Sequence, residues 1–576
     1  MKSDVQTVNF SINRFAVGFG LCSLFLFSFY IFGFFHNLNS TLSDYSWGDI
    51  SAHHQAFFNF ANHLPFHLST LSNPGYGILH NPYPFISQTA THINFSPFIW
   101  IPLYRFYPTV TGLYILIMAV NYSALIFFGQ KIVRYQTQEN VPLKLLLICS
   151  FLMSSSFLWV IEYKSHYTLF STPFILAAYA AMQRRQKGWF AAAVILICLD
   201  SEDAAIFVLT FALYFLWMEK APRFFAVFAF IFSSLYLLLV FLVIQPATRV
   251  GMQVQYSTFI VAAWHDIQAS VIPARTVRCI LPGVMFIPAF WIMHFLRKNV
   301  PYKIPLKYFG LVFLAPLGHW AIMILKPSDA HFLPILVCLY LAFLLFVAES
   351  RLTDHYAIPW PRLLTLSALI VVFLGGNLFV LRNNLPVYFK ARLKTWGQGL
   401  GAQATDRLLK DMTIEENANH EVLRTTKLLI PSHASLVIWT NRNLDAFLSA
   451  RSEVWRFPDF YNLSDFLILQ RGAQHSWVDF PSRTDEPLSR LLQEGAFHSS
   501  GEISIIDPEL VDRVKTQLVH LDRTHQILVD KPDLVVLKRI QHYEFYCPST
   551  TVGLGWMVNI PKVLHLEPTE SPVHAH

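Results

Sequence analysis

The sequence predicts a mainly α-helical, polytopic membrane protein with a C-terminal α/β domain outside the cytoplasm. Of its 576 residues, 54% are hydrophobic and only 14% are charged, a balance far from that of a soluble globule. Long apolar runs fill the first two-thirds of the chain, and cations recur in every second connection between them. Beyond residue 384 the pattern changes to short β-rich runs between helical ones.

The first apolar run, residues 15–35, follows Arg14 and ends without a small-residue cleavage site. These features favour a retained anchor over a cleaved signal peptide, with a cytoplasmic N-terminus. With ten further runs, the sequence predicts about eleven spans in residues 1–384. The later runs are 110–130, 143–161, 167–182, 188–200, 204–218, 223–244, 279–296, 306–325, 331–349 and 363–381.

The connections alternate in charge. Alternate connections carry clusters of Lys and Arg, such as "RRQK" at 184–187, and the intervening ones carry few cations. Clusters of Lys and Arg are typical of loops that remain in the cytoplasm. The regular alternation favours a helical hairpin at residues 188–218, because one long helix there would move every later loop to the opposite side. The net charge of +7 comes from short clusters with no basic stripe, which argues against a nucleic-acid partner.

The tail, residues 385–576, predicts a soluble α/β domain. Its β-rich runs lie at 434–440, 465–470, 525–530 and 534–540, and "VDKPDL" at 529–534 is typical of a hairpin turn. "EVLRTTKLL" and "PLSRLLQEG" have helical patterns. An odd number of spans places this domain outside the cytoplasm.

The scarce acids and histidines gather on the predicted outer side. In the first outer loop, 36–109, residues 49–64 have helical spacing typical of an amphipathic helix on the membrane surface. Asp49 and His53 then share one face, as a general base oriented by an imidazole or as two metal ligands. The structural alternative is that Asp49 caps the helix.

The motif "LDSEDAA" at 199–205 pairs Glu202 with Asp203. The pair could orient an acceptor hydroxyl, hold a divalent cation or begin a helix, where acids favour the positive end of the dipole. Three arginines on the same predicted side suit a phosphate or lipid headgroups. They are Arg249, Arg275 and Arg278.

Five stretches in matching order resemble an uncharacterised family of predicted bacterial membrane proteins, a domain-of-unknown-function family allied to the GT-C glycosyltransferases. The stretches begin "GDISAHHQAFFNFANH", "NFSPFIWIPLYRFYP", "HYTLFSTPFILAAYAAMQ", "DAHFLPIL" and "ASLVIWTNRNLDAFL". The residues that match the family pattern are Asp49, Gln55, His166, Glu202, Asp203 and His331. Asn94 departs from a family histidine, and His92, on the same face of an extended segment, could replace it.

The resemblance implies a GT-C-like transmembrane domain and a sugar donor linked to polyprenyl phosphate. Asp49 would deprotonate the acceptor hydroxyl, Glu202 and Asp203 would orient the acceptor or hold a metal, and the three arginines would hold phosphate. The implied location is the outer face of a bacterial inner membrane, with an envelope glycan, lipid or protein as acceptor. A transporter or flippase, or a non-catalytic envelope scaffold, are the alternatives.

Overall fold

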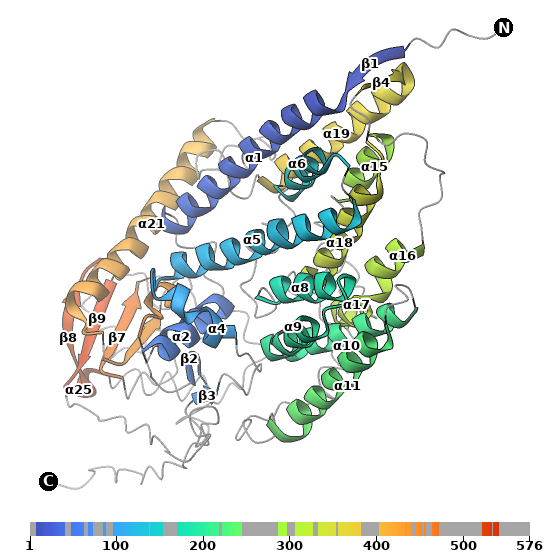
Figure 1. Cartoon of the computed structure of the whole chain (residues 1–576). Helices are drawn as coiled ribbons and strands as arrows, with labels where there is room; N and C mark the ends of the chain where they lie inside the picture. Colours follow the sequence, from blue (N-terminus) through green and yellow to red (C-terminus); the bar gives the residue numbers. More distant parts are fainter. Residues whose placement is uncertain are drawn as a thin grey trace, which may run out of the picture.

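The computed structural model describes the chain in segments. They are residues 7–40, 48–62, 67–72, 85–87, 96–137, 139–153, 170–217, 222–244, 286–296, 306–325, 332–352, 355–381, 395, 402–432, 434–439, 444–451, 454–456, 464–471, 521–532 and 534–540. Most of these residues belong to helices of one bundle, and a smaller sheet lies at its lower left (Figure 1).

Within the described residues, four helices are long and apolar enough to cross a membrane. They are α1 (Ile12–Ser40), α5 (Val110–Gln136), α11 (Arg223–Leu239) with its π-helical extension η2 (Val240–Ile244), and α19 (Trp360–Leu381). The predicted total of about eleven spans is therefore not confirmed, although a helix lies within each predicted apolar run.

The shorter helices pack between the long ones. Their bounds are α6 (Val141–Leu152), α8 (Thr172–Gln183), α9 (Lys187–Asp200), α10 (Glu202–Trp217), α15 (Phe286–Leu296), α16 (Leu306–Phe309), η3 (Gly310–Leu314), α17 (Leu317–Leu325) and α18 (Leu333–Glu349). Helix α18 is apolar on every side, and nearly all of its side chains are buried. Such a helix belongs in the centre of the bundle.

The predicted helical hairpin at residues 188–218 is confirmed. Helix α9 ends at Asp200, Ser201 adopts an extended conformation, and α10 begins at Glu202. The two helices pack side by side (Figure 1). The backbone nitrogen of Ala204 donates to the Ser201 hydroxyl at 3.0 Å, so this serine caps the new helix and fixes the break.

Cationic side chains meet at one end of the bundle, here named the basic end. Arg184, between α8 and α9, donates to the Lys131 carbonyl near the end of α5, and the Lys187 ammonium lies 5.2 Å from the Phe224 ring at the start of α11. Lys144 donates to the Ala348 carbonyl at the end of α18, over 2.8 Å. The cation-rich connections that the sequence predicts to share one side therefore lie at one end of the bundle, as far as the structure describes them.

A two-stranded sheet also lies at the basic end. Strand β1 (Thr7–Ser11) pairs antiparallel with β4 (His355–Pro359). These strands directly precede the first and the last of the four membrane-span candidates, so α1 and α19 both enter the bundle from this end (Figure 1).

The C-terminal part combines a helix with a five-stranded sheet of order β6-β5-β7-β9-β8. Its members are α21 (Ala402–Leu429), β5 (Leu436–Trp439), α22 (Asp445–Leu448), β6 (Val454–Arg456), β7 (Phe466–Gln470), α25 (Leu521–Thr524), β8 (His525–Asp530) and β9 (Leu534–Arg539). Strand β5 runs parallel to β6 and β7, and β9 runs antiparallel to β7 and β8.

This sheet confirms the four predicted strands and the closing hairpin. The turn is held by reciprocal backbone hydrogen bonds between Lys531 and Leu534. Strand β6 was not predicted, because three residues are too few to show an alternating pattern. "EVLRTTKLL" lies in α21, whereas "PLSRLLQEG" lies outside the described residues. The boundary at 384/385 and the side of the membrane remain predictions.

Candidate functional site

Residues 36–109, which the sequence predicts to be the first outer loop, contribute helix α2 (Gly48–Ala61), the hairpin β2 (His67–Ser72) with β3 (Phe85–Ser87), and α4 (Ser96–Tyr104). The predicted helix is confirmed, but its predicted position on a surface is wrong. Its buried side chains point in all directions around the helix axis: Ile50, His53, His54, Gln55, Ala56, Phe57 and Asn59. Helix α2 is enclosed because it packs on α4, α5 and the C-terminal helix α22.

His54 links three parts of the chain. Its Nδ1 lies 2.7 Å from the Ser449 hydroxyl after α22, and its Nε2 lies 2.9 Å from the Tyr104 hydroxyl at the end of α4. Burial lowers the pKa of His54 to about 4, against a small opposing effect of a backbone hydrogen bond with Pro108. The imidazole is therefore neutral at pH 7, with one nitrogen donating and the other accepting.

Gln55 makes a second link to the C-terminal part. Its side-chain nitrogen donates to the Arg451 carbonyl at 3.3 Å. The Arg451 guanidinium in turn donates to the carbonyls of Ile430 and Pro431, just after α21. The Gln55 amide thus has a structural partner, and its predicted role in substrate binding stays a prediction.

An aromatic cluster joins α2 to the membrane helices. The Phe57 ring centroid lies 5.3 Å from that of Tyr104 and 5.8 Å from that of Phe170. Phe170 also stacks on Trp100 of α4, with centroids 5.8 Å apart. Because Phe170 lies two residues before the start of α8, this cluster fixes the position of that helix end relative to α2.

The second group of predicted site residues lies at the break between α9 and α10. Asp200 is 1% exposed and Glu202 is 6% exposed, while Asp203 is half-buried. Tyr236 is buried on α11, which packs on both α9 and α10. Acids at the start of a helix are stabilised by its dipole, yet burial of two carboxylates beside a third is costly. Capping of α10 accounts for Ser201, but it does not account for the burial of Asp200 and Glu202.

Both groups lie at the same end of the bundle, opposite the basic end. Helix α8 begins beside Phe170, runs to the basic turn at Arg184, and α9 returns packed against it. Two packed helices with so short a connection are antiparallel, so Asp200 at the end of α9 lies at the level of Phe170. The buried side chains of α2 and the carboxylates of Asp200, Glu202 and Asp203 therefore lie at the same end of the bundle, here named the acidic end.

The predicted site residues are described to different extents. Asp49 lies in the first turn of α2, where its side chain is outside the described residues; His53 is 4% exposed on the same helix. Outside the described residues lie His92, Asn94, His166, Arg249, Arg275, Arg278 and His331. Among the side chains that the structure does describe, no three of the His, Cys, Asp and Glu type are grouped as metal ligands would be.

Sequence reasoning missed three residues of the acidic end. Tyr104 and Ser449 form hydrogen bonds with His54, and Tyr236 is buried on α11 beside the α9–α10 hairpin. Tyr236 lies within an apolar run, where a lone tyrosine is indistinguishable from an interfacial one. Ser449 lies 395 residues from its partner, a separation that no local pattern reveals.

These features define a multi-pass membrane protein with a buried acidic cluster and a C-terminal sheet packed on its first outer loop. Residues 69–501 match the family described as "Predicted membrane protein (DUF2079)". The match spans well over half of the chain, and the protein belongs to this family. No curated protein matches the chain. Glu202 and Asp203 lie within the matched residues, whereas Asp49, His53 and Gln55 precede them.

Proposed function

We propose that the protein is a GT-C-like glycosyltransferase that moves a sugar from a polyprenyl-phosphate donor to an envelope acceptor at the outer face of the inner membrane. One observation carries the proposal: the α2 helix, which bears Asp49, and the buried carboxylates at the α9–α10 break share the end of the bundle away from its cations. Buried acids at membrane depth are costly and are usually functional.

The positive-inside rule supports the orientation. The basic end carries cations that include Lys131, Lys144, Arg184 and Arg223, so it faces the cytoplasm. The acidic end and the C-terminal sheet then face the periplasm or the exterior. Helix α22, which connects β5 to β6, packs on α2, and this arrangement excludes water from one side of the proposed site.

The proposed reaction is a displacement at the anomeric carbon. The Asp49 carboxylate takes the proton from the acceptor hydroxyl as its oxygen forms a bond to that carbon. The bond between the carbon and the phosphate oxygen breaks, and polyprenyl phosphate leaves with the electron pair. Glu202 and Asp203 orient the acceptor or hold a divalent cation, and Arg249, Arg275 and Arg278 stabilise the phosphate charge. His53, His92, Asn94, His166 and His331 complete the substrate site.

The test uses the purified full-length chain in liposomes with radiolabelled polyprenyl-phosphate sugars and an isolated envelope fraction. Wild-type protein is expected to transfer label to the envelope fraction, and Asp49→Asn and Glu202→Gln are expected to abolish transfer while insertion is unchanged. The matched control is Glu421→Gln on α21, whose carboxylate is paired with Lys531 and Arg424 within the C-terminal part. Full transfer by Asp49→Asn would remove this residue as the base.

A non-catalytic envelope scaffold is the second candidate, and the α2 contacts favour it. His54 and Gln55 are occupied by Ser449 and Arg451, so part of the first outer loop serves to hold the C-terminal sheet. The two proposals differ in their response to Glu202→Gln, which a scaffold tolerates.

A further inference from the structure

Cationic side chains meet around the turn between α8 and α9, at the basic end of the bundle. The Arg184 guanidinium donates to the Lys131 carbonyl near the end of α5. The Lys187 ammonium lies 5.2 Å from the centroid of the Phe224 ring at the start of α11. The α8–α9 turn therefore contacts both the end of α5 and the start of α11. The cations gathered here, exposed except for the half-buried Lys131, are named the cationic patch: Lys131, Arg184, Arg185, Lys187 and Arg223.

The cationic patch has no carboxylate partner among the described residues. None of its side chains forms an ion pair there. Glu219, the acid nearest to Arg223 in the sequence, lies outside the described residues and is followed by Lys220, so these two neighbours add no net charge. A cluster of uncompensated cations produces a positive potential that attracts anions.

The ends of two helices add to this potential. Lys187 is the first residue of α9 and Arg223 is the first residue of α11, and neither helix has an acid in its first turn. The N-terminal end of a helix carries a partial positive charge, which disfavours a cation there. The fold thus brings two cations and two positive helix ends together. A bound anion stabilises such an arrangement.

Arg185 occupies a backbone conformation that suits glycine. Its φ angle is 56°, in the left-handed region. Backbone hydrogen bonds from Arg185 to Met182 and from Gln186 to Ala181 fix the turn in this form. The left-handed region disfavours side chains other than those of Asn and Asp, and residues held there are frequent at functional sites. An arginine at this position indicates a use for its guanidinium.

The cationic patch lies at the level of lipid headgroups. Helices α5 and α11 are membrane-span candidates, and the patch lies at the end of one and at the start of the other. The Lys131 ammonium is 4.1 Å from the centroid of the Phe127 ring, and Trp189, two residues after Lys187, is 74% exposed. Exposed aromatic rings are typical of the border between hydrocarbon and headgroups. A lipid phosphate therefore suits this patch better than an anion dissolved in water.

An apolar face of α11 continues from the patch. Phe224, Val227 and Ile231 follow one another at spacings of three and four residues, so they share one side of the helix. All three side chains are exposed. Exposed apolar side chains on a membrane helix contact hydrocarbon, and this face can therefore accommodate an acyl chain below a phosphate at the patch.

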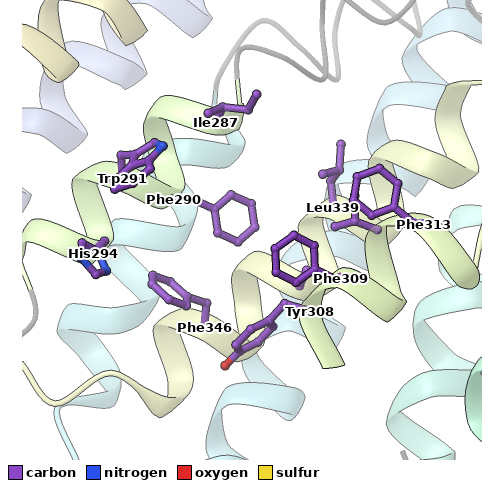
Figure 2. A pocket seen from close by; sticks show the side chains of 11 residues that line it. Ile287, Phe290, Trp291, His294, Tyr308, Phe309, Phe313, Leu339 and Phe346 are labelled. Atoms are coloured by element: carbon purple, nitrogen blue, oxygen red, sulfur yellow. The ribbon is translucent and has the colours of Figure 1, made fainter. Parts of the chain in front are cut away.

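An apolar cavity elsewhere in the bundle lacks such a charge. The cavity has a volume of about 310 Å³ between α15, η3 and α18, and its lining contains no Lys or Arg (Figure 2). Tyr308, in that lining, donates to Glu349, which pairs with Lys307. The lining of this cavity thus does not select an anion, whereas the cationic patch does.

We propose that the cationic patch binds the phosphate of an anionic phospholipid in the leaflet at the basic end, with an acyl chain along the apolar face of α11. The patch lies at the opposite end of the bundle from Asp200 and Glu202, so the proposal does not depend on glycosyl transfer. The bound phosphate compensates the charge at the starts of α9 and α11 and holds the α8–α9 turn against α11.

The experiment reconstitutes the full chain in nanodiscs with phosphatidylglycerol that carries a photoreactive diazirine in its acyl chain. A phosphatidylcholine probe with the same chain is the comparison, and labelled peptides are mapped by mass spectrometry. The phosphatidylglycerol probe is expected to label α9 and α11 several-fold more than the phosphatidylcholine probe does. Equal labelling by the two probes would overturn the anionic assignment.

Inorganic phosphate in excess, compared with chloride at equal ionic strength, distinguishes a lipid from a soluble anion. The labelling of α9 and α11 by the phosphatidylglycerol probe is expected to be the same in both salts, because the bound phosphate belongs to a lipid. Loss of labelling in inorganic phosphate alone would assign the patch to a soluble anion and contradict the proposal.

The double variant Lys187→Gln, Arg223→Gln removes the cations at the two helix starts. It is expected to reduce the preference for phosphatidylglycerol by at least about fivefold. The matched control is the double variant Arg351→Gln, Arg362→Gln, which removes the same charge around the connection between α18 and α19 and is expected to keep the preference. An unchanged preference in the first variant, or an equal reduction in both, would contradict a site at the patch.

Arg185→Gly separates lipid binding from folding. Glycine suits the φ angle of 56° at this position, so the melting temperature in detergent without anionic lipid is not expected to fall. The preference for phosphatidylglycerol is expected to fall nonetheless, because one guanidinium is lost from the patch. A preference equal to that of the wild-type protein would show that Arg185 does not contact the phosphate and would contradict its place in the site.

Discussion

The imidazole of His54 lies 2.7 Å from the hydroxyl of Ser449, which follows it by 395 residues in the chain. Both side chains are almost wholly buried. The contact ties the first outer loop to the C-terminal sheet, and the other His54 nitrogen ties it to Tyr104 of α4. Through His54, three segments that are distant in the sequence form one unit at the acidic end.

His54→Phe is expected to destabilise this unit by about 1–3 kcal/mol, because two buried hydroxyls lose their partner. Thermal unfolding in detergent, followed by tryptophan fluorescence, measures the change. His36→Phe on the exposed face of α1 is the matched control and should leave the melting temperature unchanged. A double-mutant cycle with Ser449→Ala should show coupling between the two sites, and strictly additive effects would contradict the bridge.

Acidification is expected to weaken the same unit. The folded-state pKa of His54 is lowered from 6.5 to about 4 by burial, and burial lowers the pKa of His525 in β8 to about 4 as well. A histidine with a depressed pKa favours the neutral form, so the folded state binds fewer protons and stability falls as the pH drops below about 6.5.

Each histidine contributes at most about 1.4 kcal/mol per pH unit between these values. Melting temperatures at pH 7.5 and pH 5 test the sign, and His54→Phe should flatten part of the slope. A melting temperature that rises on acidification would contradict the assignment of these two groups as neutral.

Substitutions of Ser201 and Glu202 test structure and function separately at the α9–α10 break. Ser201→Ala removes the hydroxyl that accepts from Ala204, and it is expected to cost about 1 kcal/mol of stability while transfer per folded molecule is retained. Glu202→Gln keeps the side-chain volume and is expected to abolish transfer with little change in stability. If Glu202→Gln instead lowered the stability and retained transfer, the acids would serve only to initiate α10.

Gly112 fixes the approach of the first outer loop to α5. A Cβ at this position would lie 1.8 Å from the Tyr107 carbonyl oxygen, so Gly112→Ala must displace the turn that carries Tyr104. We expect a loss of roughly 1–3 kcal/mol and increased protease cleavage of the loop. Gly188→Ala in α9 is the control, because no atom lies within 4 Å of its added Cβ, and it should not destabilise the protein.

The sequence predicted the helices well because burial in a membrane leaves a strong local signal. Apolar runs located α5, α9 and α10, and charge alternation predicted the hairpin that breaks at Ser201. The resemblance to the uncharacterised membrane-protein family, confirmed by the match over residues 69–501, added order along the chain, whereas the kinship with GT-C glycosyltransferases stays a prediction. These patterns did not decide the number of spans, which side of the membrane each loop faces, or which residues form the proposed site.

The position of α2 could not be predicted, because the spacing of its apolar residues suits both a membrane surface and a site enclosed by other parts of the protein. A helix with apolar residues on one face suits a membrane surface, yet His54 and Gln55 on its other faces are buried by α4 and α22. Which environment applies depends on a partner hundreds of residues away. The strand β6 and the π-helix η3 are similarly set by their neighbours in the fold.

The pairing of β1 with β4 has a consequence for how the chain is made. Strand β1 is complete after eleven residues, but its partner ends at Pro359, so the pairing must wait until most of the polypeptide has left the ribosome. During synthesis the first helix is therefore inserted without its final tether. When α19 follows β4 into the bilayer, the strand pair joins the first and the last of the four membrane-span candidates and completes the assembly of the bundle.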